Sequence, residues 1–142
     1  MTVTPHWIDG ARTTGASTRT GDVFRPSTGE VARQVALADQ SDVDLAVSSA
    51  VKAAQSWSDS SLATRSRVLF AFRQLVHEHA GELAEIISSE HGKVVSDAAG
   101  EVQRGLEVVE FACGIPHLLK GGYTENASTK VDVHSSLQPL GP

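Results

Sequence analysis

The 142-residue sequence predicts a mixed α/β fold in which short strands come first, helices occupy the middle, and a further strand lies near the end. Three observations support this prediction. The first 36 residues combine β-prone residues with turn signals such as Asp9-Gly10. Apolar residues then recur with a helical period, and residues 130–135 alternate between apolar and polar side chains.

The strands are expected near His6–Ile8, Asp22–Phe24 and Val31–Ala36, because turn signals separate these β-prone runs. A first helix is expected to begin at Ser41, with Asp44 three residues later as the shorter-acid variant of a capping box. Its apolar stripe comprises Val43, Val47, Ala50, Val51, Ala54 and Trp57.

A second helix is expected after Ser60-Ser61, with a bend near Gly81 and an end at Gly92, a residue suited to the left-handed conformation that stops a helix. Its expected buried side begins with Val68, Leu69, Phe72, Leu75 and Val76. Its expected solvent side contains Arg65, Arg67, Arg73 and Glu78.

A long helix is expected over Ser96–Leu119, with Pro116 kinking or ending its last turns. One apolar face comprises Ala98, Val102, Leu106, Val109 and Cys113, and a second row comprises Val108, Phe111 and Ile115. A helix that is apolar on two sides is normally covered on two sides, so we expect this one to lie between layers.

The tail, from Lys130 to Ser135, has the period-2 pattern of an edge strand, and nothing after it would cover that edge. The last four residues, Pro139–Pro142, form a turn sequence that ordinarily connects to a further element. We therefore expect that the chain is interrupted at this point.

Composition excludes several classes of function. The net charge of −5 disfavours nucleic-acid binding, and no apolar run is long enough for a membrane span. The six histidines are scattered without metal-site spacing, and the single cysteine allows no internal disulfide. No phosphate-binding glycine motif or nucleophile elbow is present, so we expect no metal, cofactor or catalytic residue in this chain, and a cytoplasmic location.

Arg104 is the candidate site residue, because it is a cation in the middle of an otherwise apolar helix. In one interpretation it forms an intrahelical pair with Glu101 or Glu107, each three residues away. In the other, it presents its guanidinium to the carboxylate of a ligand, which Gly105 beside it allows to approach closely. The residues alone leave both interpretations open.

Several landmarks in order resemble the N-terminal part of the aldehyde dehydrogenase superfamily over essentially the whole chain. They are WIDG at Trp7–Gly10, PSTGEV at Pro26–Val31, a helix ending in Trp57, and Glu90-His91-Gly92-Lys93. Within the superfamily, the run Asp97–Gly114 is most similar to the CoA-acylating methylmalonate-semialdehyde dehydrogenase branch. Arg25 departs from the family's usual asparagine, which puts one local turn contact in doubt.

This resemblance implies a fold in which residues 1–125 form an N-terminal β-region and helices flanking a Rossmann-like NAD-binding domain, and residues 126–142 begin an oligomerisation strand. It implies an enzyme whose cysteine thiolate attacks an aldehyde, passes hydride to NAD and releases the thioester to CoA. The complete enzyme would be a homodimer or homotetramer acting on a small semialdehyde, and Arg104 would bind the substrate carboxylate.

In the family, the oxyanion-binding asparagine, the cofactor strands and the catalytic cysteine follow the segment matched by Pro139–Gly141. We therefore expect this chain alone to be inactive, with Cys113 as an apolar helix residue and not the nucleophile. Two alternatives to an N-terminal fragment of a semialdehyde dehydrogenase stay open. In one, the chain is a non-catalytic module that pairs with a complete subunit. In the other, it is part of a general NAD-dependent aldehyde dehydrogenase that does not use CoA.

Overall fold

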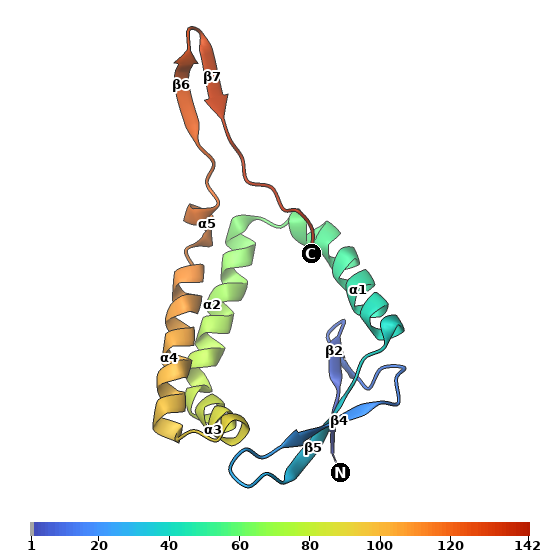
Figure 1. The fold of residues 1–142 in the computed structure, drawn as a ribbon. Helices are drawn as coiled ribbons and strands as arrows, with labels where there is room; N and C mark the ends of the chain where they lie inside the picture. Colours follow the sequence, from blue (N-terminus) through green and yellow to red (C-terminus); the bar gives the residue numbers. More distant parts are fainter. Residues whose placement is uncertain (1) are drawn as a thin grey trace.

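The computed structural model describes residues 2–142 and arranges them as small sheets, a helical layer and a terminal hairpin (Figure 1). The strands are β1 (Val3–Thr4), β2 (His6–Ile8), β3 (Ala11–Thr13), β4 (Thr20–Phe24) and β5 (Val31–Ala36). The helices are α1 (Gln40–Ser58), α2 (Leu62–Glu78), α3 (Ala80–His91), α4 (Val95–Ala112) and α5 (Ile115–Leu118). The hairpin consists of β6 (Tyr123–Ser128) and β7 (Val131–His134). The mixed α/β class predicted from the sequence is confirmed.

Two small sheets form the N-terminal region. In the first, β5 lies between β1, which is parallel to it, and β4, which is antiparallel. In the second, β2 and β3 form a hairpin whose two turn residues, Asp9 and Gly10, both have positive φ angles of 54° and 74°. This is the geometry that Asp-Gly favours in a two-residue hairpin. The predicted strands β2, β4 and β5 are confirmed, whereas β1 and β3 were not predicted.

The start of α1 differs from the prediction, because Asp39 and not Ser41 is its N-cap. Asp39 accepts a hydrogen bond from the Asp42 amide, and Asp42 accepts one from the Asp39 amide at 3.0 Å, completing a capping box. The buried Asp42 carboxylate also accepts the Ala16 amide at 2.7 Å. The backbone amides of Asp39 and Ala16 thus lower the pKa of Asp42. These two carboxylates satisfy the helix terminus, and Asp44 instead pairs with Gln40.

The second predicted helix is divided into α2 and α3 at His79, two residues before the expected bend at Gly81. Ser61 caps α2 by accepting the Thr64 amide, and His79 contacts Glu82 at 3.0 Å in the first turn of α3. The left-handed stop at Gly92 is confirmed, with φ of 80°. A side chain at Gly92 would also lie 3.1 Å from Pro26, so this position needs glycine for two reasons.

The core lies where α3 and α4 pack together, and its buried residues are small. Ala84, Ala98 and Val102 form its centre, with Val76, Ala80, Leu83 and Ile87 packed around them. Leu106 and Cys113 extend the same buried face of α4, as predicted. The regular helix ends at Ala112, and Pro116 lies in the first turn of the separate helix α5.

The second apolar row of α4 is not covered within residues 2–142, contrary to the expectation of a helix between two layers. Val108 is 68% exposed and Phe111 is 71% exposed. The predicted stripe of α1 and much of the predicted buried side of α2 are also exposed, including Val47, Trp57, Val68 and Phe72. These side chains are only about half covered by the described part of the chain.

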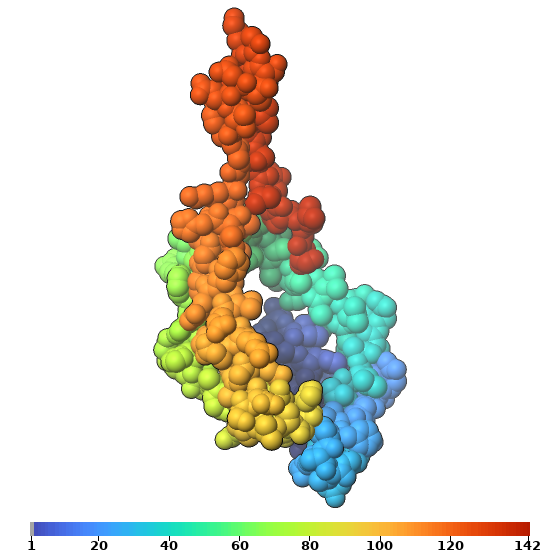
Figure 2. All heavy atoms as spheres, turned by 60° about the vertical axis from the view of Figure 1, so that its left-hand side comes forward, coloured from blue at the N-terminus to red at the C-terminus, as the bar shows by residue number. Residues whose placement is uncertain are grey.

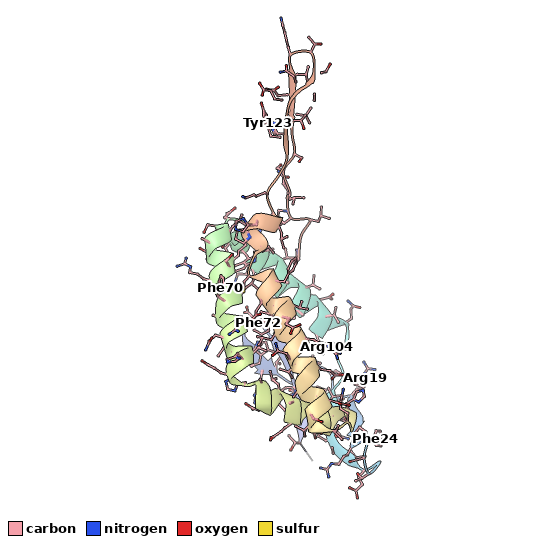
Figure 3. All side chains as sticks on the ribbon, turned by 90° about the vertical axis from the view of Figure 1, so that its left-hand side faces the viewer. Arg19, Phe24, Phe70, Phe72, Arg104 and Tyr123 are labelled. Atoms are coloured by element: carbon pink, nitrogen blue, oxygen red, sulfur yellow. The ribbon has the colours of Figure 1, made fainter. Side chains whose placement is uncertain are left out.

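The β6–β7 hairpin projects away from the helices, and every residue of its strands is exposed (Figure 2). Tyr123 donates to Asp132 at 2.8 Å, and the Asn126 amide donates to the same carboxylate at 2.8 Å (Tyr123 is labelled in Figure 3). The bond to Asp132 raises the pKa of Tyr123, while the Asn126 amide lowers the pKa of Asp132. The boundary predicted between residues 125 and 126 falls inside β6, and the oligomerisation role of this segment stays a prediction.

The chain exposes far more surface than its size requires. Its accessible surface is 10528 Å², whereas a monomeric globular protein of this length exposes about 7,000 Å². No large side chain among the described residues is fully buried. The helices and strands are therefore well formed individually, but most of their apolar faces are uncovered.

Candidate functional site

Arg104 lies midway along α4, on the face opposite the core (Figure 3). Val108 and Phe111 follow it at positions i+4 and i+7, so the three side chains occupy one outer stripe of the helix. All three are exposed. A Cβ atom added at the neighbouring Gly105 would meet no atom within 4 Å, so the space beside the arginine is open. The stripe thus combines one fixed positive charge with two apolar side chains.

Arg104 forms no ion pair and no side-chain hydrogen bond within residues 2–142, although a glutamate lies three residues away on each side. Glu101 is instead bound by Lys93, whose Nζ lies 2.6 Å from Glu101 Oε1. Glu107 accepts a hydrogen bond from Gln103 at 3.2 Å. The structure therefore does not contain the intrahelical pair that the sequence allowed, and it leaves the guanidinium available.

Lys93 is held in place by the turn between α3 and α4. Ser88 donates its hydroxyl to the Lys93 carbonyl at 2.6 Å, and the Gly92 amide bonds to the Ser88 carbonyl at 2.8 Å. The lysine side chain is only 20% exposed, whereas that of Glu101 is 47% exposed. The hydrogen bond from Lys93 lowers the pKa of Glu101, and the charges of Lys93, His91 and Arg104 act in the same direction.

Two further ion pairs join elements around α4. Arg73 on α2 donates from Nε and Nη2 to Glu110 Oε1 on α4, at 2.9 and 2.6 Å. Arg33 on β5 donates to Glu90 on α3 at 2.6 Å and connects the N-terminal sheet to the helical layer. The sequence pattern predicts Arg73 on the solvent side of α2 but not its partner, because residues 37 positions apart show no local spacing.

Cys113 lies on the buried side of α4 and is 8% exposed. It lines an open depression of about 560 Å³ between α2 and the α4–α5 junction, together with Ser66, Phe70 and Glu110. Its burial agrees with the expected role as an apolar helix residue. Among residues 2–142, no three histidine, cysteine or acidic side chains are grouped as a metal site would require, and no helix has the length and apolar character of a membrane span.

The substrate-binding role of Arg104 stays a prediction. Two nearby residues that the sequence analysis did not single out bind the glutamates on either side of it. Lys93 and Gln103 each engage one of the glutamates that flank Arg104. The Gln103–Glu107 contact has i, i+4 spacing and could have been identified from the sequence. The Lys93–Glu101 contact spans a turn and has no such spacing.

The sequence and fold of this chain match those of known proteins. Residues 13–142 match the profile of the aldehyde dehydrogenase family. A malonate-semialdehyde dehydrogenase of Pseudomonas aeruginosa is 43% identical over 123 residues, which cover 87% of this chain and 25% of that protein. A Drosophila melanogaster protein named as an acylating methylmalonate-semialdehyde/malonate-semialdehyde dehydrogenase is 40% identical over 135 residues, covering 95% of this chain and 26% of that one.

A solved structure has the same arrangement of elements. It is a Sinorhizobium meliloti protein described as a methylmalonate-semialdehyde dehydrogenase and crystallised with NAD. It is 46% identical and superposes with a TM-score of 0.92, over 99% of this chain and 29% of that chain. The chain thus spans between a quarter and 29% of the length of these relatives. With a family match over residues 13–142 and relatives that are 40% to 46% identical, this chain belongs to the aldehyde dehydrogenase family.

Proposed function

We propose that this chain is the N-terminal part of an oxidoreductase that oxidises malonate or methylmalonate semialdehyde to an acyl-CoA. The names of the relatives support this substrate class, and the acylating name of the Drosophila protein supports CoA as the acceptor. The observation that carries the proposal is the free guanidinium of Arg104 beside Val108 and Phe111 on an open helix face. A short semialdehyde with a carboxylate at one end needs such a cation, bordered by apolar surface.

Arginine is the suitable side chain for this role. Its guanidinium stays charged at all relevant pH values and matches the two oxygens of a carboxylate with parallel N–H groups. Glu101 and Glu107, the two carboxylates nearest in sequence, are both engaged elsewhere. The substrate would therefore supply the partner that Arg104 lacks in the described chain.

NAD and CoA are proposed as cofactors of the complete enzyme, but residues 2–142 do not fit a dinucleotide site. The only direct passage from a strand to a helix in this range is from β5 to α1. The N-terminus of α1, where a pyrophosphate would bind in such a motif, is filled by the carboxylates of Asp39 and Asp42. Negative charge at that position repels phosphate, so we assign the binding of NAD to the remainder of the enzyme.

The uncovered surface supports the view that this chain functions inside a larger fold and is inactive alone. The chain exposes about 3,500 Å² more surface than a monomeric globular protein of this length. The exposed surface includes apolar residues of α1, α2 and α4. The projecting β6–β7 hairpin supports assembly into a homodimer or homotetramer, because its strands have free edges. A cytoplasmic location belongs to the same proposal.

The experiment is a chimera in which residues 1–142 replace the matching segment of a complete related dehydrogenase, selected so that the unsubstituted chimera oxidises malonate semialdehyde. Removing one partner of a charge pair that the remainder of the enzyme encloses and desolvates costs about 2 to 5 kcal/mol, or roughly one and a half to over three powers of ten in kcat/KM. Arg104→Ala should lower kcat/KM for malonate semialdehyde by this factor and leave propanal unaffected.

Arg67→Ala is the matched control, because Arg67 is also an exposed helical arginine and bonds only to Thr64. It should leave both substrates unchanged. A loss of activity on both aldehydes in Arg104→Ala, or on neither, would show that Arg104 has no carboxylate-binding role. Formation of free acid without acyl-CoA would favour the CoA-independent alternative.

A further inference from the structure

We propose that Lys93 is a positioning residue that keeps Arg104 available to the substrate by holding Glu101 away from it. This inference rests on the proposed function, since it concerns the same carboxylate-binding site. The observation behind it is that Glu101 and Arg104, at i, i+3 spacing on α4, do not pair with each other. A lysine from outside the helix takes the glutamate instead.

The geometry favours Lys93 over Arg104 as the partner of Glu101. The Lys93 side chain is four-fifths buried and its backbone is fixed by the Ser88 hydroxyl and the left-handed Gly92, so pairing requires little further ordering. Arg104 would have to order a long exposed side chain along the helix surface to reach the same carboxylate. Exposed pairs of that kind on a helix surface are weak.

Without Lys93, the Glu101 carboxylate would lose its partner while remaining one helical turn from Arg104. It would then compete with the substrate carboxylate for the same guanidinium and repel the substrate by its own charge. His91 is the other positive or titratable group acting on Glu101, and it lies at the exposed end of α3. On the opposite side, the neutral amide of Gln103 donates a hydrogen bond to the Glu107 carboxylate.

The test uses Lys93→Gln in the chimera described above. A Glu101–Arg104 pair at i, i+3 spacing is worth about 0.2 to 0.5 kcal/mol, so competition from Glu101 should raise KM for malonate semialdehyde by about 1.4- to 2.3-fold. Values of kcat for both substrates and KM for propanal should not change. Lys93→Arg should behave like the unsubstituted chimera, because it retains a cation for Glu101.

The decisive variant is the double substitution Lys93→Gln with Glu101→Gln, which removes the competitor as well as its partner. It should restore KM for malonate semialdehyde, although the ion pair is absent. If the pair served only to clamp the turn to α4, the double variant and Glu101→Gln alone would be as impaired as Lys93→Gln. Such a result would overturn the proposal, as would an unchanged KM in Lys93→Gln.

The two proposals fail in different ways. If Arg104→Ala affects both aldehydes equally, the substrate-binding role itself is wrong. If Arg104→Ala is selective for malonate semialdehyde but Lys93→Gln is not, only the role of Lys93 is wrong. A crystal structure of Lys93→Gln gives a readout independent of activity, since it should show the Glu101 carboxylate turned to Arg104.

Discussion

Replacing Gly15 with alanine should release the loop after β3 from the start of α1. Gly15 has a φ angle of 78°, and a Cβ atom there would lie 2.6 Å from Asp42 Oδ1, the oxygen that accepts the Ala16 amide. The left-handed conformation costs alanine about 1 to 2 kcal/mol, and the overpacking adds about 1 to 3 kcal/mol. Gly29 is a matched control, because its φ is 74° but nothing lies within 4 Å of the added atom. Gly29→Ala should therefore cost about 1 to 2 kcal/mol.

Hydrogen–deuterium exchange of the two variants in the chimera measures this difference locally. Because Gly15→Ala adds the overpacking cost to the left-handed strain, its local amide exchange should be accelerated about five- to 150-fold more than that of Gly29→Ala. In Gly15→Ala, the acceleration should include residues 14–20 and the first turn of α1, because Asp42 links both segments. In Gly29→Ala it should stay in the turn between β4 and β5. Equal acceleration in the two variants, or an unaffected first turn of α1, would refute the steric argument.

Two further predictions concern the same chain. The pKa of Asp42 is lowered by folding, so the stability that its carboxylate contributes is present above its unfolded pKa and lost as pH falls through the folded value. Exchange at the first turn of α1, corrected for the intrinsic rate, should therefore accelerate below about pH 4, and Asp42→Asn should abolish this acceleration. The isolated 142-residue chain should self-associate on size-exclusion chromatography because its apolar faces are uncovered. A dilute monomer that melts cooperatively would contradict this.

The fold could be predicted where local chemistry determines it. The Asp9-Gly10 turn, the helix start after Ser60-Ser61 and the left-handed Gly92 were predicted, because each depends on residues adjacent in sequence. The predicted N-terminus of α1 is wrong because two residue pairs, Asp39 with Asp42 and Ser41 with Asp44, both have the spacing of a capping box. The choice between them depends on the Ala16 amide, which is 26 residues from Asp42. A tertiary contact therefore selected Asp39 over Ser41, and local spacing carried no information about it.

The candidate site could also be predicted only in part from local sequence patterns. Helical periodicity placed Arg104 on α4 and correctly identified the buried face containing Ala98, Val102 and Leu106. It could not decide whether the arginine was paired, because two glutamates stood at equally suitable spacing. Glu101 is bound by Lys93 instead, and the turn at Gly92 and the Ser88 hydroxyl hold Lys93 in position. The availability of Arg104 thus depends on which neighbouring carboxylates have other partners: Gln103 on the same helix binds Glu107, and Lys93 from outside the helix binds Glu101.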